Sequence, residues 1–177
     1  QLPAKTAILG NVKGSIFTTM DAVVYAGGKP GKSVNVRHSF MSDTKLTTFS
    51  DLFISSLKTL SEDQSIQVIL INFLGTIPQV DKLPEIMGNF LQLNRSEITS
   101  EMLITNNKIQ NQVNLPHLVF RLVGSQFNDL REYIATLKNT NQSLILAEDL
   151  DEAVKEAVRL VKLPEDKKKS REVKVKK

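Results

Sequence analysis

The stretch IQVILINFLGTIP, residues 66–78, decides the fold. Its first part, Ile66–Phe73, is almost entirely apolar, which is typical of a strand buried on both faces of a parallel sheet. The loop that follows contains Gly75 and ends at Pro78, a residue favoured at the first position of a helix. The stretch therefore predicts a buried strand, a glycine loop and a helix start in direct succession.

The same pattern recurs along the chain, since short apolar runs alternate with amphipathic segments. We expect strands at Thr6–Leu9, Ser33–Val36, Ile66–Phe73, Leu115–Leu122 and Leu144–Ala147, and helices at Ser15–Ala26, at Thr44–Leu60, from Pro78 onward, at Phe127–Leu137 and at Leu150–Val161. Ser42 and Asp43 are the N-cap candidates of the second helix. Uninterrupted alternation of five strands with five helices predicts a parallel sheet covered on both faces. We therefore predict an α/β fold, a flavodoxin-like three-layer sandwich with strand order 2-1-3-4-5.

The charge of the chain is concentrated at its end. The formal net charge is +4, and Glu165 to Lys177 holds seven basic and three acidic residues, so the rest is neutral. We predict one domain over residues 1–163 with a polar, Asn-rich insertion at 92–114, followed by a basic, disordered tail at 164–177. The tail has no interleaved aromatic residues, which argues against nucleic acid as a partner. It is either a solvated charge run or an electrostatic tether to an acidic partner.

The composition excludes several chemistries. Without cysteine the chain has no disulfide, no thiolate metal site and no thiol nucleophile, and a reducing compartment, cytoplasm or organelle matrix, is compatible with this. No apolar run approaches the ~20 residues of a membrane span, and no signal peptide is visible. We expect no metal site and no cofactor held by this chain itself. Because the chain opens on Gln1 rather than Met, we expect that a segment has been removed or that the sequence is a piece of a longer protein.

Ligands of doubly wound sheets bind at the carboxyl ends of the strands, where the strand order reverses. For the predicted order this place lies between the loops Gly10–Gly14 and Asn72–Pro78. Both loops lead into predicted helix N-termini, whose free N–H groups suit a phosphate or a carboxylate. The alternative is that Gly10, Gly14 and Gly75 are only tight-turn residues. No glycine motif of nucleotide-binding proteins and no Ser/His/Asp signature is present.

Four further residues are candidates for anion contacts or for acid–base chemistry. Arg37 and His38 follow the second predicted strand, near the predicted ligand site between the two loops. No carboxylate partner for His38 is identifiable. Arg121 lies near the end of the fourth strand, where it faces an anion or pairs with a carboxylate. His117 lies within an apolar strand and is better interpreted as a core or edge histidine than as a base. We therefore assign no catalytic residue.

Six segments form a set of motifs: NVKG at 11–14, TMD at 19–21, GGKP at 27–30, VILINFLGTI at 68–77, PHLVFRLVG at 116–124 and EDLDEA at 148–153. They resemble the N-G-A-G, A-T-M-D, G-G-x-P, V-x-V-N-I-F-G-G-I and P-V-V-V-R-L-x-G motifs and the start of the last helix of one protein family, the β subunits of succinyl-CoA synthetase. The order is that of the family, with one extra residue before the arginine of the 116–124 segment. The resemblance runs from about Ala7 to Val161 and implies the C-terminal CoA-ligase domain, which is flavodoxin-like and also occurs in ATP-citrate lyase.

The resemblance also implies a site and partners. In this family an ATP-grasp module precedes the domain, which packs against an α subunit whose phosphorylated histidine receives the phosphoryl group. By resemblance, the residues that line the phosphate and carboxylate end of the site are Asn11, Gly14, Asn72, Gly75, Thr76 and Ile77. The loop at residues 75–77 then opens a helix whose N-terminus faces the phosphohistidine. The implied partners are an α-subunit-like CoA-binding chain, an ATP-grasp module or a larger assembly, and self-association of the body stays open.

Two loops depart from the family pattern. Thr76 replaces the second glycine of G-G-I, and Pro78 removes one N–H from the expected helix start. Residues 35–40, NVRHSF, stand where the family has D-V-G-G-G-A. We therefore predict a CoA-ligase-type domain with degraded catalytic loops that serves as a non-catalytic assembly or regulatory subunit. The alternative is a fragment or split β subunit of a working, ADP- or GDP-forming acyl-CoA synthetase that supplies the helix N-terminus facing the phosphohistidine.

Overall fold

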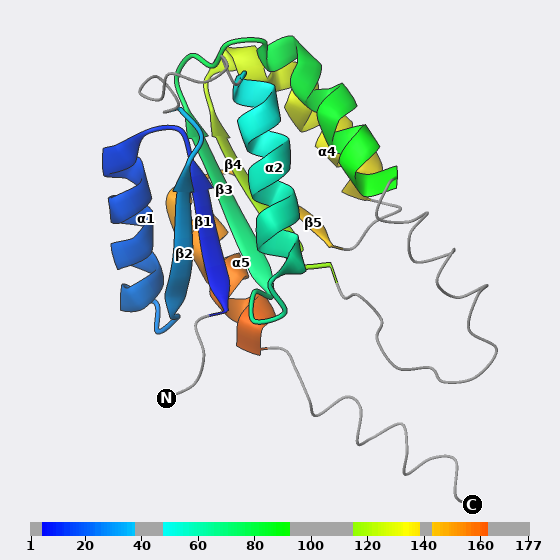
Figure 1. Ribbon diagram of the computed structural model, residues 1–177. Helices are drawn as coiled ribbons and strands as arrows, with labels where there is room; N and C mark the ends of the chain where they lie inside the picture. The colour runs from blue at the N-terminus through cyan, green and yellow to red at the C-terminus, as the bar shows by residue number, and fades with distance from the viewer. Residues whose placement is uncertain (1–4, 38–47, 93–114, 139–142, 163–177) are drawn as a thin grey trace, which may run out of the picture.

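The sheet has the predicted topology. A computed structural model describes residues 5–37, 48–92, 115–138 and 143–162, so the predicted tail and nearly all of the predicted insertion lie outside the described residues. Five strands form one parallel sheet: β1 (Thr6–Gly10), β2 (Pro30–Asn35), β3 (Val68–Leu74), β4 (His117–Val123) and β5 (Leu144–Ala147). Their order, β2-β1-β3-β4-β5, confirms the flavodoxin-like arrangement (Figure 1).

Helices cover both faces of the sheet (Figure 1). The α1 face is covered by α1 (Lys13–Tyr25) and α5 (Leu150–Lys162), and the α2 face by α2 (Phe49–Glu62), the helical residues 83–92 and α4 (Asn128–Lys138). Among the described residues, no helix is long and apolar enough to cross a membrane.

The central strand β3 supplies both hydrophobic cores. Val68 and Leu70 are buried against the α1 face, whereas Ile69, Ile71 and Phe73 are buried against the α2 face. Because successive side chains of a strand point to opposite faces, a strand covered on both sides needs apolar residues at every position. This explains the continuous apolar run from which the fold was predicted.

An aromatic cluster fixes the carboxyl end of β3 against the α2 face. The ring of Phe73 is fully buried. Its centroid lies 5.6 Å from the ring centroid of Phe49 and 5.4 Å from that of Phe53, both on α2 and both in edge-to-face arrangements, and 6.3 Å from that of Phe127. Such pairs add to the free energy of burial alone. Phe73 therefore holds the strand end that carries the loop of residues 75–79.

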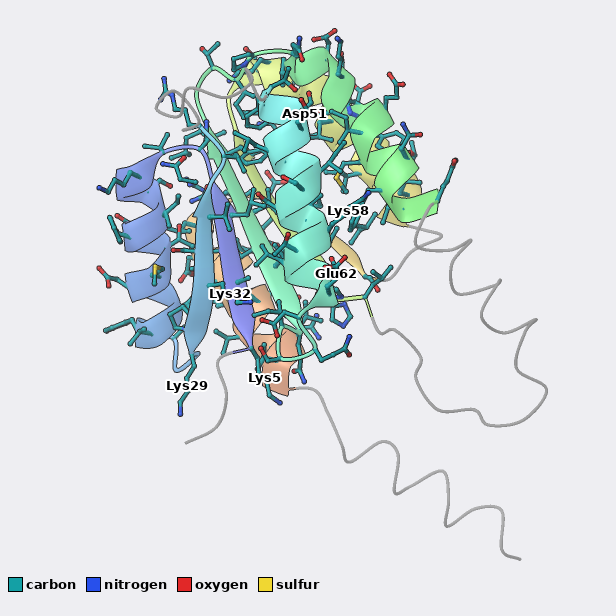
Figure 2. The ribbon with its side chains drawn as sticks, in the orientation of Figure 1. Lys5, Lys29, Lys32, Asp51, Lys58 and Glu62 are labelled. Carbon is teal, nitrogen blue, oxygen red and sulfur yellow. The ribbon has the colours of Figure 1, made fainter. Side chains whose placement is uncertain are left out.

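The α2 helix begins later than the predicted start at Thr44, which is therefore wrong. Its N-cap is Thr48: the Thr48 hydroxyl accepts a hydrogen bond from the Asp51 N–H, and the Asp51 carboxylate accepts one from the Thr48 N–H. This reciprocal capping box satisfies two backbone donors and decides the helix start. The predicted caps Ser42 and Asp43 lie outside the described residues. Figure 2 shows Asp51 and Glu62 at opposite ends of α2.

The helix predicted to start at Pro78 also begins later, and that prediction is wrong. Residues 78–79 form a turn, in which Gln79 is the one described non-glycine residue with a positive φ, 57°. A 3-10 turn, Val80–Lys82, follows, and α-helical residues run from 83. Pro78 therefore lies outside the helix and removes no donor from it.

The second strand begins three residues before the predicted Ser33, at Pro30. Proline and glycine look like turn residues in the sequence, but β2 is an edge strand, and an edge strand tolerates proline at its first position. Lys32 of β2 pairs with Asp63 at 2.5 Å, and Figure 2 shows Lys5, Lys29 and Lys32 toward the edge of the sheet where β1 begins.

The aromatic cluster predicts the effect of truncating Phe73. Phe73→Ala leaves a cavity that Phe49, Phe53 and Phe127 line, so we expect the free energy of unfolding to fall by about 3–5 kcal/mol. Phe73→Leu keeps most of the volume and should lose much less. Urea denaturation of the three proteins measures both effects, and a loss below about 1 kcal/mol for the alanine variant would contradict the role of this ring.

Candidate functional site

A row of residues crosses the carboxyl edge of the sheet. The strand register places Asn35, Gly10, Asn72 and Arg121 beside one another on β2, β1, β3 and β4. Residues paired in this way on parallel strands point to the same face, here the α1 face. The row crosses the point between β1 and β3 at which the strand order reverses, so the candidate site lies where the topology predicts it.

Asn72 lies at the centre of this row and is only 1% exposed. Its Nδ2 donates to the Oγ of Ser15 and to the Oγ1 of Thr19, each at 2.9 Å, and its Oδ1 accepts from Nη1 of Arg121 at 3.0 Å. Ser15 and Thr19 are one helical turn apart on α1, so they meet the same carboxamide. Asn72 thus joins β3 to α1 on one side and to β4 on the other.

Asn11, directly after β1, is also 1% exposed and closes the loop after β1 onto the end of β3. Its Nδ2 donates to the carbonyl oxygen of Leu74 at 2.8 Å, and its Oδ1 accepts from the Leu74 N–H at 2.9 Å. The carboxamide therefore binds a backbone unit at both ends, as a neighbouring strand would. Both of its polar ends are used within the protein.

Arg121 has no carboxylate partner in the part of the chain that the structure describes. None of the ion pairs found there includes it, and its Nε is buried without a hydrogen-bond partner. The sequence left open whether Arg121 faces an anion or pairs with a carboxylate, and the group it contacts is the amide oxygen of Asn72. A guanidinium without a counter-charge at this edge of the sheet still favours an anion.

The three loop glycines have different explanations. A Cβ at Gly10 would lie 2.7 Å from Cγ1 of Ile16 and 3.2 Å from the carbonyl oxygen of Asn72, so glycine allows α1 to pack here. Gly75 has a φ of +68°, a conformation that glycine adopts without strain. Gly14 is exposed within α1, and apart from its chain neighbours and the backbone of α1 no atom lies within 4 Å of where its Cβ would be. Turn geometry and packing explain Gly10 and Gly75 but not Gly14.

The remaining predicted residues are more dispersed. Thr76 is exposed in the loop after β3, whereas the Ile77 side chain is buried in the core of the α2 face. Arg37 is exposed after the edge strand β2, where its backbone N–H donates to Oδ1 of Asn35 at 3.0 Å. His38 lies outside the described residues. The structure thus brings Asn72 and Arg121 into contact and joins Asn11 to Leu74, the residue before Gly75.

Sequence reasoning missed the side chains that hold these loops. Ser15 and Thr19 bind Asn72, and their signal was a pair of hydroxyl residues four apart on the α1 side that is otherwise apolar. Gln126 donates to the carbonyl oxygen of Gly75, and Arg131 donates to the carbonyl oxygens of Leu122 and Gly124. The Gln126 contact joins the loops after β3 and β4, whereas the Arg131 contacts join α4 to the end of β4. No sequence pattern indicates these contacts.

His117 is the first residue of β4, an inner strand, and lies at the amino ends of the strands, opposite the polar row; the sequence predicted a core or edge histidine there. It is half-buried, and its Nδ1 is buried without a partner among the described residues. Burial, and then the positive charge of Arg159, lower the pKa of this imidazole. Both effects favour the neutral form of the imidazole over the charged form.

The Asn72 contacts predict a large cost for an apolar replacement. Asn72→Leu removes the acceptor of Arg121 and the donor to two hydroxyls, and buried groups left unpaired cost about 1–3 kcal/mol each. We expect the free energy of unfolding to fall by at least about 2 kcal/mol. The matched control is Asn89→Leu, at an exposed helical position, which should change stability little. Equal effects of the two variants would contradict the bridging role of Asn72.

The lowered pKa of His117 predicts a pH dependence of stability. The unfolded chain binds a proton near the ordinary pKa of 6.5 whereas the folded protein does so only at lower pH, so stability falls as the pH drops below that value. We expect His117→Leu to remove this part of the loss between about pH 7.5 and 5.5. The control His38→Gln changes the other histidine of the chain. An unchanged pH profile in His117→Leu would contradict the prediction.

No protein-family profile matches the chain. The chain is similar to the β subunit of an ADP-forming succinate–CoA ligase, a hydrogenosomal protein of Neocallimastix frontalis, with 30% identity over 152 residues. These residues are 86% of this chain but 28% of that protein, so the chain spans less than a third of the length of its relative. The similarity supports a CoA-ligase-related domain.

Proposed function

We propose that this chain is the counterpart of the C-terminal CoA-ligase domain of such β subunits, and that it serves as a non-catalytic assembly or regulatory subunit. The similarity to the succinate–CoA ligase subunit extends over 86% of the chain, and the flavodoxin-like sheet fits the domain that the resemblance implies. The relative is a subunit of a ligase, which supports a protein partner for this chain as well.

One observation carries the non-catalytic role. Asn11 and Asn72, which the resemblance assigns to the phosphate and carboxylate end of the site, are both buried. Their amide groups are bonded to Leu74, to Ser15 and Thr19, and to Arg121. Both hydrogens of the Asn72 Nδ2 and one hydrogen of the Asn11 Nδ2 are bonded within the protein, and each Oδ1 accepts one hydrogen bond there. Carboxamides bonded in this way have little left to offer a ligand. This supports a role of the two asparagines in holding the sheet edge together.

The loop after β3 supports the same proposal. An oxyanion or phosphoryl group is stabilised where free N–H groups of a helix N-terminus point at it. Here a turn and a 3-10 segment, residues 78–82, separate Gly75 from the helical residues that start at 83. The carbonyl oxygen of Gly75 also accepts a hydrogen bond from Gln126, which fastens the loop to its neighbour.

Two residues favour the alternative, a split or partial subunit of a working acyl-CoA synthetase. Gly14 leaves open space at the start of α1, and no side chain caps this helix. Arg121 lacks a carboxylate partner in the described part of the chain. Together they favour an anion site between β1 and β3.

The hydrogenosomal location of the relative supports an organelle matrix for this chain.

Turnover separates the two functions. The full chain, alone and mixed with a succinate–CoA ligase α subunit and an ATP-grasp module, is assayed with succinate and CoA under ADP- or GDP-forming conditions. We expect no turnover above that of the mixture without the chain, because the carboxamides of Asn11 and Asn72 are occupied within the protein. Substantial turnover that requires the chain would establish the alternative.

The melting temperature, measured with and without inorganic phosphate, provides the second test. We expect phosphate not to raise the melting temperature of the wild-type protein, and Gly14→Ala to raise the free energy of unfolding by about 0.5–1 kcal/mol, because a helical alanine meets no atom there. Stabilisation by phosphate that both Gly14→Ala and Arg121→Gln abolish would contradict the proposal and favour the enzyme. Asn89→Leu is the control variant.

A further inference from the structure

The α1 helix has an apolar outer face. Among the described residues four large hydrophobic side chains are exposed, and three of them lie on α1: Phe17 at 54%, Val24 at 58% and Tyr25 at 96%. A surface helix normally carries polar side chains opposite its core-facing stripe. Here α1 buries Ile16 and Val23 against the sheet and still exposes this second stripe. Figure 1 shows α1 at the margin of the molecule, with its outer side uncovered by any described element.

The outer stripe carries two opposite charges at a fixed spacing. Lys13, Phe17 and Asp21 follow one another at intervals of four residues and form one ridge of the helix surface. Lys13 and Asp21 are both exposed, and neither belongs to an ion pair of the described residues. They are eight residues apart, about 12 Å along the axis, and therefore cannot pair with each other.

The position of Lys13 leaves the start of α1 without an anion. Lys13 is the first residue of the helix, where the backbone dipole disfavours a cation, and the first turn contains no acidic residue. No side chain caps this end. A carboxylate placed beside Lys13 would therefore meet both a lysine and a helix N-terminus.

We propose that a second copy of this chain covers the face, with the two α1 helices antiparallel about a two-fold axis at Phe17. In this arrangement Lys13 of each copy pairs with Asp21 of the other, so the ion pair forms twice, and the two Phe17 rings meet at the axis. An interface of this kind is isologous, because the same ridge supplies both partners. The inference goes beyond the proposed function and does not depend on it.

The size of the face sets the strength of the contact. The 13 residues of α1 give a face about 20 Å long and about 10 Å wide. The area of this face is a fraction of the roughly 800 Å² that each partner buries in a stable complex. The dimer is therefore weak and dependent on concentration. A monomer–dimer equilibrium is the expected behaviour, not a permanent dimer.

Charge reversal tests the register directly. Lys13→Glu and Asp21→Lys each turn two attractive pairs into two repulsive ones, and we expect each variant alone to dimerise about tenfold more weakly than wild type. In an equimolar mixture, the glutamate introduced by Lys13→Glu in one chain faces the lysine introduced by Asp21→Lys in the other. The unchanged Asp21 of the first chain then faces the unchanged Lys13 of the second, so both ion pairs return. Dimerisation in the mixture, measured by sedimentation equilibrium over a range of concentrations, should recover to within a few-fold of wild type.

Two further variants control the test. Phe17→Glu places like charges at the axis and should leave a monomer, while its exposed helical position keeps the fold intact. Lys58→Glu reverses an exposed lysine of α2, labelled in Figure 2, and should leave dimerisation unchanged. A wild-type chain that stays monomeric up to millimolar concentration, a dimer that Phe17→Glu leaves intact, or a mixture that does not recover would each overturn the proposal.

Discussion

The buried carboxamide of Asn72 is the interaction on which the arrangement of the sheet edge depends. It binds two hydroxyls of α1 and the guanidinium of Arg121, and so connects three elements that the chain visits far apart in sequence. Asn11 adds a second connection, from the end of β1 to the backbone of β3. Because buried polar groups are costly when unpaired, these contacts specify how α1, β1, β3 and β4 meet.

This constraint bears directly on function. The edge at which the strand order reverses is where doubly wound folds place ligands, and here its amide groups are already bonded within the protein. What remains open is the backbone around Gly14 and the charge of Arg121. The inward bonding of these groups supports the proposed role in an assembly over the stabilisation of a transferring phosphoryl group. The exposed side chains of α1 lie on the surface where we propose self-association.

The sheet could be predicted from the sequence because β3 is apolar at nearly every position and the alternation of strands and helices is regular. The predicted starts of two helices were wrong because local hydrogen bonds and backbone conformation decide them. The Thr48–Asp51 capping box sets the start of α2, and the left-handed conformation of Gln79 precedes the later start of the helix after β3. The row of the candidate site followed from topology. That Asn11 and Asn72 bond inward could not be predicted, since it depends on which atoms face them across the sheet, and a sequence does not contain those distances.

The inward bonding of Asn11 and Asn72 is tested most directly by a nuclear magnetic resonance titration of their side chains. We expect the carboxamide N–H signals that are bonded within the protein, assigned with Asn→Asp variants, to exchange slowly with solvent and not to move when inorganic phosphate or CoA is added. Fast exchange of these protons, or shifts of both signals on adding either probe, would show that the carboxamides are offered to a ligand and would contradict the inward bonding.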